Sequence, residues 1–397
     1  MLKGKTVILG ITGSIAAYKI ANLASMLSKQ HANVHVIMTK NATNFINPIT
    51  FETLTGNKCL IDTFDRNFEF SVEHVSLAKA ADILMIAPAS ANIIGKMANG
   101  IADDMLTTTF LACKCPVFVS PAMNTRMYEN PIVQDNIQKL KDYNINIIDP
   151  ACGMLACKDT GAGKMPEPGE LYKYIYNAIA FDKILKGKRI LITAGPTREA
   201  IDPVRYITNH STGKMGYAIA NVAAAMGADV TLVTGPTNID KPLFANKIID
   251  ISSAKDMFEA VKSEYDNVDI VIKSAAVADF TPENYNNEKT KKNTMSRSIP
   301  LKPTTDILKY LGENKKHQFL CGFSMETENM FENSKRKLER KNLDMIVANN
   351  LKVKGAGFGT DTNIVTVITK DDVVEFPIMS KEDVAKELLT LIYNKTK

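Results

Sequence analysis

The sequence predicts an α/β protein with two doubly wound, Rossmann-like domains. Short apolar runs rich in β-branched residues alternate with helical stretches, which is typical of parallel sheets covered on both faces. One layout also occurs twice, at 3–39 and 186–234: Lys-Gly-Lys, an apolar strand, a turn of small residues, an Ala-rich helix and a second strand. A length of 397 residues suits two to three domains. We therefore expect two α/β domains with nucleotide-binding folds, at 1–185 and 186–397.

Composition excludes several classes of protein. Hydrophobic residues make up 45% and charged residues 23% of the chain, as in an ordinary globular protein. The net charge of +5 suits anionic small molecules, and no aromatic-rich basic repeat points to nucleic acid. No apolar run reaches the roughly 20 residues that span a membrane. Six cysteines in a chain of this length are not a disulfide framework, so we expect a cytoplasmic protein with reduced thiols.

In the first half we expect a helix from Ile15 to about Leu27 and a closing helix at 171–185. The predicted strands lie at 7–10, 34–39, 83–90, 115–123 and 145–150. The segment 151–169 is rich in Gly and Pro and lacks periodicity. It is too long for a routine connection, so we interpret it as a functional loop or flap.

In the second half the polar, Lys-rich segment between Pro282 and Pro300 lacks periodicity and is interpreted as a loop that closes over phosphates. The predicted strands lie at 189–194, 229–234, 247–252, 269–276, 318–324, 343–350 and 363–369.

Three polar loops of the first half follow predicted strands, at 10–14, 88–92 and 121–124. Because the carboxyl ends of parallel strands meet at one sheet edge, these loops predict a shared ligand site there. Each also has a plain structural interpretation. The turn at 10–14 could be only a tight turn, and Asn124 could only cap the next helix.

His74 and Cys157 are candidate catalytic residues, but their residue types alone do not decide it. A lone histidine is more often structural, and a lone cysteine is often incidental. Cys152 and Cys157 could form a metal pair, but no second Cys or His pair lies nearby in the sequence to complete a zinc site.

Taken together, the first-half motifs resemble the flavin-dependent cysteine decarboxylases, and more narrowly phosphopantothenoylcysteine decarboxylase. These motifs are GITGSIAAYK, EHVSLA, PASANIIGKMANGIADDMLTTT, PAMNTRMY and the flap 156–165. The resemblance implies that His74 is a base, that Asn124 binds the substrate carboxylate and that Cys157 donates a proton. It also implies a flavodoxin-like first domain and assigns FMN binding to Gly13, Ser14, Thr39, Ser90, Asn92, Thr108, Ala122 and Met123. The chain departs from the family at Lys158, where glycine is usual.

The implied reaction explains the need for a flavin. A simple carboxylate has nowhere to place the electrons left behind by CO2. Oxidation of the substrate CH2–S to a thioaldehyde creates an electron acceptor, CO2 then leaves, and reduction completes the sequence. The protein orients the substrate and moves protons.

The second half contains Gly213-Lys214, which is not a phosphate-binding Walker loop because Met215 replaces the Ser or Thr that binds magnesium. The predicted helix start still suits a phosphate. Asp279 follows a strand and is a candidate metal or ribose ligand. Lys289, Lys291 and Lys292, and the pair Lys337 and Lys341 one helical turn apart, could equally be solvated charges.

The second-half motifs resemble phosphopantothenate–cysteine ligase of the bacterial, CTP-dependent type. The resemblance implies that Asn209 holds an acyl-cytidylate, that Lys289 assists its formation or its attack by cysteine, and that Asp279 binds Mg2+. It assigns CTP contacts to Lys273, Ser274, Ala275, Asp279, Lys289, Thr304, Thr305, Asp306, Ile307, Phe323, Lys337 and Lys341. The loop Thr304-Thr305-Asp306-Ile307 lacks the family's proline, which leaves its rigidity open.

The order of the two halves resembles the bifunctional bacterial flavoproteins of coenzyme A biosynthesis. This implies a multifunctional lyase and ligase acting on 4′-phosphopantothenate, cysteine and CTP, and a homo-oligomer with trimeric decarboxylase and dimeric ligase contacts, possibly a dodecamer. Two alternatives remain: another flavin-dependent cysteine decarboxylase or a flavin prenyltransferase fused to an unrelated domain, and a non-catalytic regulatory protein. The presence of His74, Asn124 and Cys157 beside the ligase motifs argues against both.

Overall fold

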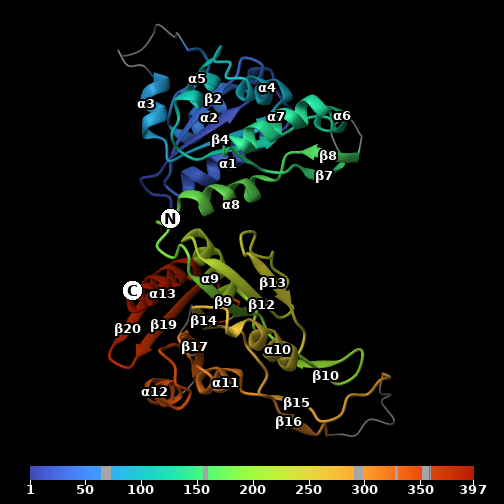
Figure 1. Ribbon diagram of the computed structural model, residues 1–397, viewed down its shortest axis with the longest axis vertical. Coiled ribbons are helices and arrows are strands. Elements are labelled where there is room, and N and C mark those ends of the chain that lie inside the picture. The colour runs from blue at the N-terminus through green and yellow to red at the C-terminus, as the bar shows by residue number, and fades with distance from the viewer. Residues whose placement is uncertain (64–72, 155–159, 290–297, 327–329, 351–356, 358) are drawn as a thin grey trace. The chain divides into compact units, whose positions relative to one another are not determined.

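The computed structural model describes residues 1–63, 73–154, 160–289, 298–326, 330–350, 357 and 359–397. The chain forms two compact units, Met1–Phe181 and Asp182–Lys397, and each contains one large sheet with helices on both faces (Figure 1). The prediction of two doubly wound α/β domains is confirmed. None of the helices in the described ranges has the length and apolar character needed to cross a membrane.

The first unit has a six-stranded parallel sheet in the order β3-β2-β1-β4-β5-β6. The order reverses direction between β1 and β4, so the crevice for a ligand lies beside the ends of these strands. The sheet strands are β1 (Thr6–Ile11), β2 (Asn33–Met38), β3 (Cys59–Leu60), β4 (Ile83–Ala89), β5 (Val117–Pro121) and β6 (Asn146–Ile147). A separate antiparallel hairpin joins β7 (Ala151–Met154) and β8 (Thr160–Lys164).

Helices cover both faces of this sheet. Helix α1 contacts α2 and α8, whereas α4 contacts α5 and α7, with α3 against α5 (Figure 1). Buried side chains of α4, α5 and α7 form one core with β1, β4 and β5. The helices are α1 (Ala17–Lys29), η1 (Ala42–Asn44), α2 (Pro48–Thr55), α3 (Glu73–Ala80), α4 (Ala91–Ala98), α5 (Met105–Ala112), α6 (Thr125–Tyr128), α7 (Pro131–Asp142) and α8 (Pro168–Ile179).

The second unit has an eight-stranded sheet in the order β13-β12-β9-β14-β17-β18-β19-β20, antiparallel only at β19 and β20. Its strands are β9 (Arg189–Ala194), β12 (Asp229–Thr234), β13 (Lys247–Asp250), β14 (Ile270–Lys273), β17 (Phe319–Glu326), β18 (Met345–Asn350), β19 (Thr362–Thr369) and β20 (Val373–Ser380). Two small hairpins pair β10 (Arg198–Ala200) with β11 (Tyr206–Thr208), and β15 (Phe280–Pro282) with β16 (Leu301–Pro303).

The helices of the second unit also lie on both faces. Helix α9 contacts β9 and α13, while α10, α11 and α12 contribute to the core on the other face (Figure 1). They are α9 (Lys214–Ala225), α10 (Ala254–Tyr265), α11 (Ile307–Glu313), α12 (Met330–Arg340) and α13 (Lys381–Lys395). The buried alanines of α9 let this helix lie close to the sheet.

The structure differs from the sequence expectations at two kinds of place. Helix α1 begins at Ala17 instead of Ile15, because the turn after β1 continues through a bond from Ser14 N to Thr12 O. The segment expected to be a flap without regular structure contains the hairpin β7–β8, built around small residues that give no hydrophobic alternation. Strand β20 and the two small hairpins of the second unit were not predicted.

Candidate active sites

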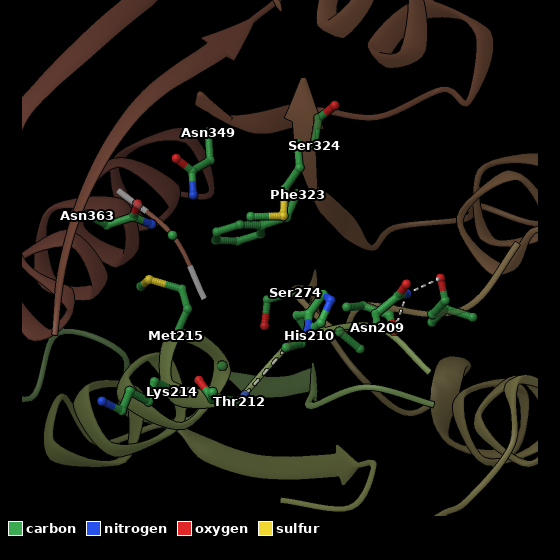
Figure 2. Close-up of a pocket in the computed structure, with 18 of the residues that line it drawn as sticks. Asn209, His210, Thr212, Lys214, Met215, Ser274, Phe323, Ser324, Asn349 and Asn363 are labelled. Atoms are coloured by element: carbon green, nitrogen blue, oxygen red, sulfur yellow. Dashed lines mark hydrogen bonds between the residues drawn. The ribbon is translucent and has the colours of Figure 1, made fainter. Parts of the chain in front are cut away.

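The second unit contains a cavity of about 460 Å³ beside the carboxyl ends of β14, β17 and β18 and the start of α9. Figure 2 shows Phe323, Asn349 and Asn363 facing Met215 and Ser274 across it. Residues 209–216, which follow β11, form another wall. The cavity therefore lies where a doubly wound sheet binds ligands.

The start of α9 is held close to this sheet edge by small residues. Gly213 precedes the helix with φ +80°, a backbone conformation that favours glycine. A Cβ at Gly216 would lie 2.5 Å from Ala194 Cβ and 2.7 Å from Ser274 Oγ. Ser274 is itself fixed, because its hydroxyl donates to Thr193 O at 2.7 Å. The N-terminus of α9 is thus held at the edge of the cavity, close to β9 and Ser274.

A second cavity of about 240 Å³ adjoins the first. The two share five lining residues, Ala275, Val277, Asp279, Phe323 and Lys337. The outer wall of the second cavity is the loop 304–307. The two spaces therefore form one continuous binding region.

The loop 304–307 is fixed by hydrogen bonds instead of a proline. Thr304 N donates to Asp279 O at 2.9 Å, and Thr304 Oγ1 donates to Ala278 O at 2.6 Å. Asp306 caps α11 by accepting from Lys309 N at 3.1 Å. These bonds give the loop a defined conformation despite its departure from the family sequence.

Charged groups of opposite sign face each other in the second cavity. Lys341 Nζ lies 2.8 Å from Asp306 Oδ2. Desolvation alone would raise the pKa of Asp306, but hydrogen bonds from Lys341 and Lys309 N lower it. Burial, and then the positive charge of Lys341, lower the pKa of Lys273 to about 8, against the opposing effect of Asp306 and Asp279. This end of the site is thus cationic at neutral pH.

Two further lysines fasten one rim of the larger cavity. Lys214 Nζ lies 2.6 Å from Asp361 Oδ1 and donates to Gly359 O at 3.0 Å. Lys381 is 6% exposed and donates to the carbonyl oxygens of Gly357 and Thr360. Burial, and then repulsion by Lys214, lower the pKa of Lys381. Both ammonium groups therefore have protein partners along this rim.

In the first unit a buried threonine joins the loops that follow β1 and β4. Thr12 Oγ1 donates to Pro88 O at 2.7 Å and accepts from Ser90 N at 2.9 Å. A Cβ at Gly13 would lie 2.8 Å from Asn41 Cβ, so the loop after β2 also lies close to the loop after β1. Three strand-end loops thus meet at the switch point of the sheet.

These loops surround a cavity of about 340 Å³, lined among others by Thr12, Gly13, Thr39, Ser90, Asn92, Lys96, Asp103, Asp104 and Met127. Lys96 Nζ lies 2.7 Å from Asp103 and 3.1 Å from Asp104. These carboxylates, first through the hydrogen bond with Asp103, raise the pKa of Lys96. The lysine is therefore already neutralised, and hydroxyl, amide and backbone groups line the rest of the cavity.

The loop that contains Asn124 lies beside the hairpin β7–β8. Asn124 caps α6 by accepting from Arg126 N at 2.9 Å, as its alternative interpretation as a helix cap predicted. Met123 N donates to Gly163 O at 3.1 Å, which joins this loop to β8. The hairpin and the Asn124 loop are thus in direct contact.

Two family models match nearly the whole chain. The Flavoprotein model matches residues 1–180, and the model of the DNA/pantothenate metabolism flavoprotein C-terminal domain matches residues 185–395. The coenzyme A biosynthesis bifunctional protein CoaBC of Bacillus subtilis (strain 168) is 50% identical over 392 residues, 98% of this chain and 97% of that protein. The chain belongs to the CoaBC family.

Another CoaBC protein, from Borreliella burgdorferi, is 44% identical over 396 residues, 99% of this chain and 100% of that protein. A crystal structure of the C-terminal domain of a CoaBC protein matches 54% of this chain and 98% of that domain, with 49% identity and a TM-score of 0.47. As a CoaBC family member, the chain is a bifunctional enzyme of coenzyme A biosynthesis. Its flavoprotein domain is a phosphopantothenoylcysteine decarboxylase, and its second domain is a phosphopantothenate–cysteine ligase.

The ligase residues implied by the CoaBC resemblance come together in space, with one exception. Asn209 and Ser274 line the larger cavity, and Asp279 and Phe323 line both. Lys289 is exposed and is not among the residues lining either cavity. The smaller cavity is also lined by Lys273, Ala275, Thr304, Thr305, Asp306, Ile307, Lys337 and Lys341. Lys291 and Lys292 lie outside the described residues.

The decarboxylase residues come together less completely. Gly13, Thr39, Ser90 and Asn92 line the cavity of the first unit. His74, half-buried in α3, is not among its lining residues, and neither are Ser14, Thr108, Ala122 and Met123. Cys157 and Lys158 lie outside the described residues.

Several lining residues were missed from the sequence. Asn349, Asn363 and Lys381 line the larger ligase cavity and are all less than 9% exposed. Asn349 follows the apolar run of β18, so its place at the carboxyl end of a predicted strand was a usable signal. Lys96 and Met127 of the first unit gave no comparable signal.

Proposed function

We propose that residues 186–397 join 4′-phosphopantothenate to cysteine at the expense of CTP, and that residues 1–185 decarboxylate the product with FMN to 4′-phosphopantetheine. The observation that carries this proposal is the pair of adjoining cavities in the second unit. They share five residues, and the smaller is lined by ten of the residues that the resemblance assigns to CTP. A nucleotide and an acyl substrate can thus meet at the shared residues.

The ligase reaction needs cations where phosphate charge develops. The carboxylate attacks the α-phosphorus, pyrophosphate leaves, and the cysteine amine then displaces CMP. Lys273, Lys337 and Lys341 line the smaller cavity and supply positive charge for the nucleotide. In a site of low dielectric such preorganised charges are worth more than in water.

Asn209 is suited to hold the acyl intermediate. Its Nδ2 donates to Ala276 O at 3.1 Å and to Val277 O at 3.3 Å, which fixes the amide beside the loop after β14. Because Nδ2 faces these carbonyls, Oδ1 is the atom that we propose accepts a hydrogen bond from an N–H group of the substrate.

Asp279 is the residue that we propose for Mg2+. It is the one carboxylate among the lining residues of both cavities, whereas Asp306 is paired with Lys341. No cluster of three or more His, Cys, Asp or Glu side chains suited to a metal occurs within the described residues. A single carboxylate such as Asp279 suits Mg2+, which takes most of its ligands from substrate phosphates and water.

The first unit fits a flavin nucleotide with a single phosphate. The strand-end loops offer the hydroxyls of Thr39 and Ser90, the amide of Asn92 and the start of α4, while Gly13 allows close approach of the backbone. When bound, FMN supplies the two-electron oxidation and its reversal.

The residues of this chain then hold the substrate and move its protons. We assign His74 as the base that removes a proton from the substrate CH2–S group. Asn124, whose amide orientation is set by the bond from Arg126 N, binds the substrate carboxylate. Cys157 donates the proton that completes the reaction.

We also infer a homo-oligomer that acts in the cytoplasm. Val204, Tyr206, Phe280 and Tyr285 are 46–57% exposed on or beside the two small hairpins of the second unit, and suit a contact between copies. Cytoplasmic conditions would keep the described cysteines, all free thiols, reduced.

The test supplies the full chain with FMN, Mg2+, 4′-phosphopantothenate and carboxyl-labelled cysteine, and follows labelled CO2 with and without CTP. CO2 release that requires CTP supports both activities in sequence. Formation of CMP without CO2 release would contradict the decarboxylase roles assigned to His74, Asn124 and Cys157. If neither CMP nor CO2 forms, the proposal fails and a non-catalytic role takes its place.

A further inference from the structure

Lys381 is a buried lysine of the larger ligase cavity to which the CoaBC resemblance gives no role. It is the first residue of α13 and is 6% exposed. Its backbone N donates to Asp361 O at 3.0 Å, and Ser380 caps the helix by accepting from Asp383 N at 3.0 Å. The backbone of this lysine is therefore fixed at the wall of the cavity.

The ammonium group of Lys381 has carbonyl partners but no carboxylate partner among the described residues. Its Nζ donates to Gly357 O at 3.1 Å and to Thr360 O. The nearby carboxylate of Asp361 is instead paired with Lys214 Nζ, at 2.6 Å. An ammonium has three N–H groups, so one remains for a ligand. Because a buried charge is costly without an opposite charge, an anion in the cavity would stabilise this arrangement.

Two buried amides line the cavity together with Lys381. Asn349 is 5% exposed and Asn363 is 3% exposed, and Figure 2 shows both facing the cavity. Asn349 Oδ1 is buried and has no hydrogen-bond partner within the parts of the chain that the structure describes. A buried polar atom is rarely left unsatisfied, so this amide indicates a ligand. Rotating the amide by 180° exchanges its oxygen and nitrogen, which would direct an N–H group at an anion.

The chemical class of the ligand follows from the charges and donors around this part of the cavity. Lys381 and the two amides line the larger cavity and not the smaller one, so the group that they bind lies outside the smaller cavity. The wall also includes the start of α9, whose first N–H groups have no acceptor within the helix. Among the described lining residues, three lysines, Lys381 included, outnumber the one carboxylate, that of Asp279. Several N–H donors with an excess of positive charge suit a phosphate group.

We propose that Lys381, with Asn349 and Asn363, forms a phosphate-binding subsite in the part of the larger cavity that the smaller one does not share. This inference rests on the proposed ligase function of the second unit and adds residues that bind its substrates. Both substrates carry a suitable group. CTP has its β- and γ-phosphates, which leave as pyrophosphate, and the acid has its 4′-phosphate.

The test measures dissociation constants of the full chain by calorimetric titration, with Mg2+, for two pairs of ligands that differ in phosphate groups. The pairs are CTP with CMP, and 4′-phosphopantothenate with pantothenate. Lys381→Met removes the charge and keeps most of the side-chain length. We expect it to weaken the phosphate-bearing member of one pair about tenfold and to change its truncated partner by less than about twofold. An effect on CTP assigns the subsite to the β- and γ-phosphates, and an effect on 4′-phosphopantothenate assigns it to the acid.

Two control variants separate binding from the support of the rim, and a third tests the amides. Lys386→Met removes the same charge from the same helix at a more exposed ion pair with Glu387, 3.2 Å long. Thr360→Val removes a hydroxyl bond within the rim, to Thr362 O at 2.9 Å, and leaves Lys381 in place. Both should leave all four dissociation constants nearly unchanged. Asn363→Asp keeps an acceptor for Ile364 N but adds a negative charge, so it should weaken the same ligand as Lys381→Met.

The possible outcomes distinguish the subsite from the ligase function. If the wild-type chain binds neither CTP nor 4′-phosphopantothenate and forms no CMP, the proposed ligase function itself fails. If it binds them and Lys381→Met weakens neither, or weakens both members of a pair equally, the subsite is wrong. The same selective loss in Thr360→Val would also overturn the subsite, because Lys381 would then act only by holding the rim. Should Lys381→Met not fold, Asn363→Asp decides.

Discussion

The two active sites of this chain are assembled differently. In the ligase unit, the implied nucleotide contacts from β14, the loop 304–307, β17 and α12 line adjoining cavities, with Lys289 the exception. In the decarboxylase unit, the strand-end loops form the flavin cavity, while Asn124 lies against a hairpin and His74 lies in α3. A site built on strand ends is fixed by the sheet itself. A site that includes a hairpin depends on how that hairpin docks.

The largest effect should come from Asp279→Asn, which removes the carboxylate common to both ligase cavities. We expect ligase kcat/KM to fall by about 10²–10³, because the Mg2+ that we propose to neutralise the developing phosphate charge would lose its protein ligand. CO2 release from synthetic 4′-phosphopantothenoylcysteine should be unchanged. The exposed Asp371, in the turn between β19 and β20, gives the matched control Asp371→Asn. Equal losses in both variants would disprove the assignment.

Thr12→Val tests the hydrogen bonds that join the loops after β1 and β4 in the first unit. The substitution keeps the shape but leaves Ser90 N without its buried acceptor and Pro88 O with only the 3.3 Å bond from the backbone N of residue 12, and should destabilise the first unit by about 1–3 kcal/mol. Urea unfolding followed by flavin fluorescence measures this, and ligase activity reports on the second unit. Thr53→Val, which removes an exposed helical hydroxyl, should have a much smaller effect. A stable Thr12→Val chain that binds flavin normally would contradict the importance of this bridge.

Lys341→Met should raise the dissociation constant for CTP about tenfold, the equivalent of about 1.4 kcal/mol. The lysine loses its contact with Asp306, and the cavity loses one positive charge. Lys316→Met breaks an ion pair of the same 2.8 Å length, with Asp266, at a site where both side chains are more than 60% exposed. Calorimetric titration with CTP compares the two. If both variants weaken CTP binding equally, the change in net charge is responsible and the local pair of Lys341 with Asp306 is not.

The smallest effect is a pH dependence of CTP binding. The pKa of Lys273 is lowered to about 8, so this side chain loses its charge as pH rises through that value. Its protonated fraction falls roughly eightfold between about pH 7.5 and pH 9, and affinity for CTP should fall by at most that factor. Lys273→Arg should abolish the decline. Because the charge of Lys341 lowers this pKa, Lys341→Met should move the decline to higher pH, and an unchanged midpoint would refute the coupling.

The sequence predicted most of what the parallel sheets determine. Ser90 and Asn92 after β4 were expected at a sheet edge because parallel strands end together, whereas Ser274 and Ala275 after β14 were implied only by the family resemblance. The convergence of the loop 304–307 with Lys341 was implied only by family resemblance, since nothing local links segments so far apart. Strand-end positions such as Ser90 and Asn92 are the parts of the site that the parallel topology of the sheet determines.

What the sequence did not predict depends on long-range placement. Asn363 and Lys381 reach the ligase cavity from β19 and α13, elements attached to the antiparallel edge of the sheet. The hairpin β7–β8 was expected only as a loop, because Gly161 and Gly163 give no hydrophobic pattern. The close approach of these glycines to Thr125 and Met123 is visible only in the structure.

The five residues shared by the two ligase cavities have a consequence for inhibition. A molecule that fills the smaller cavity also contacts Phe323, Asp279 and Lys337 of the larger one. Two weakly bound fragments, one in each cavity, could therefore be joined by a short linker across these residues. The second fragment would then bind intramolecularly, at an effective concentration of order mM. Such a compound should compete with both of the proposed ligase substrates, CTP and 4′-phosphopantothenate, at the same time.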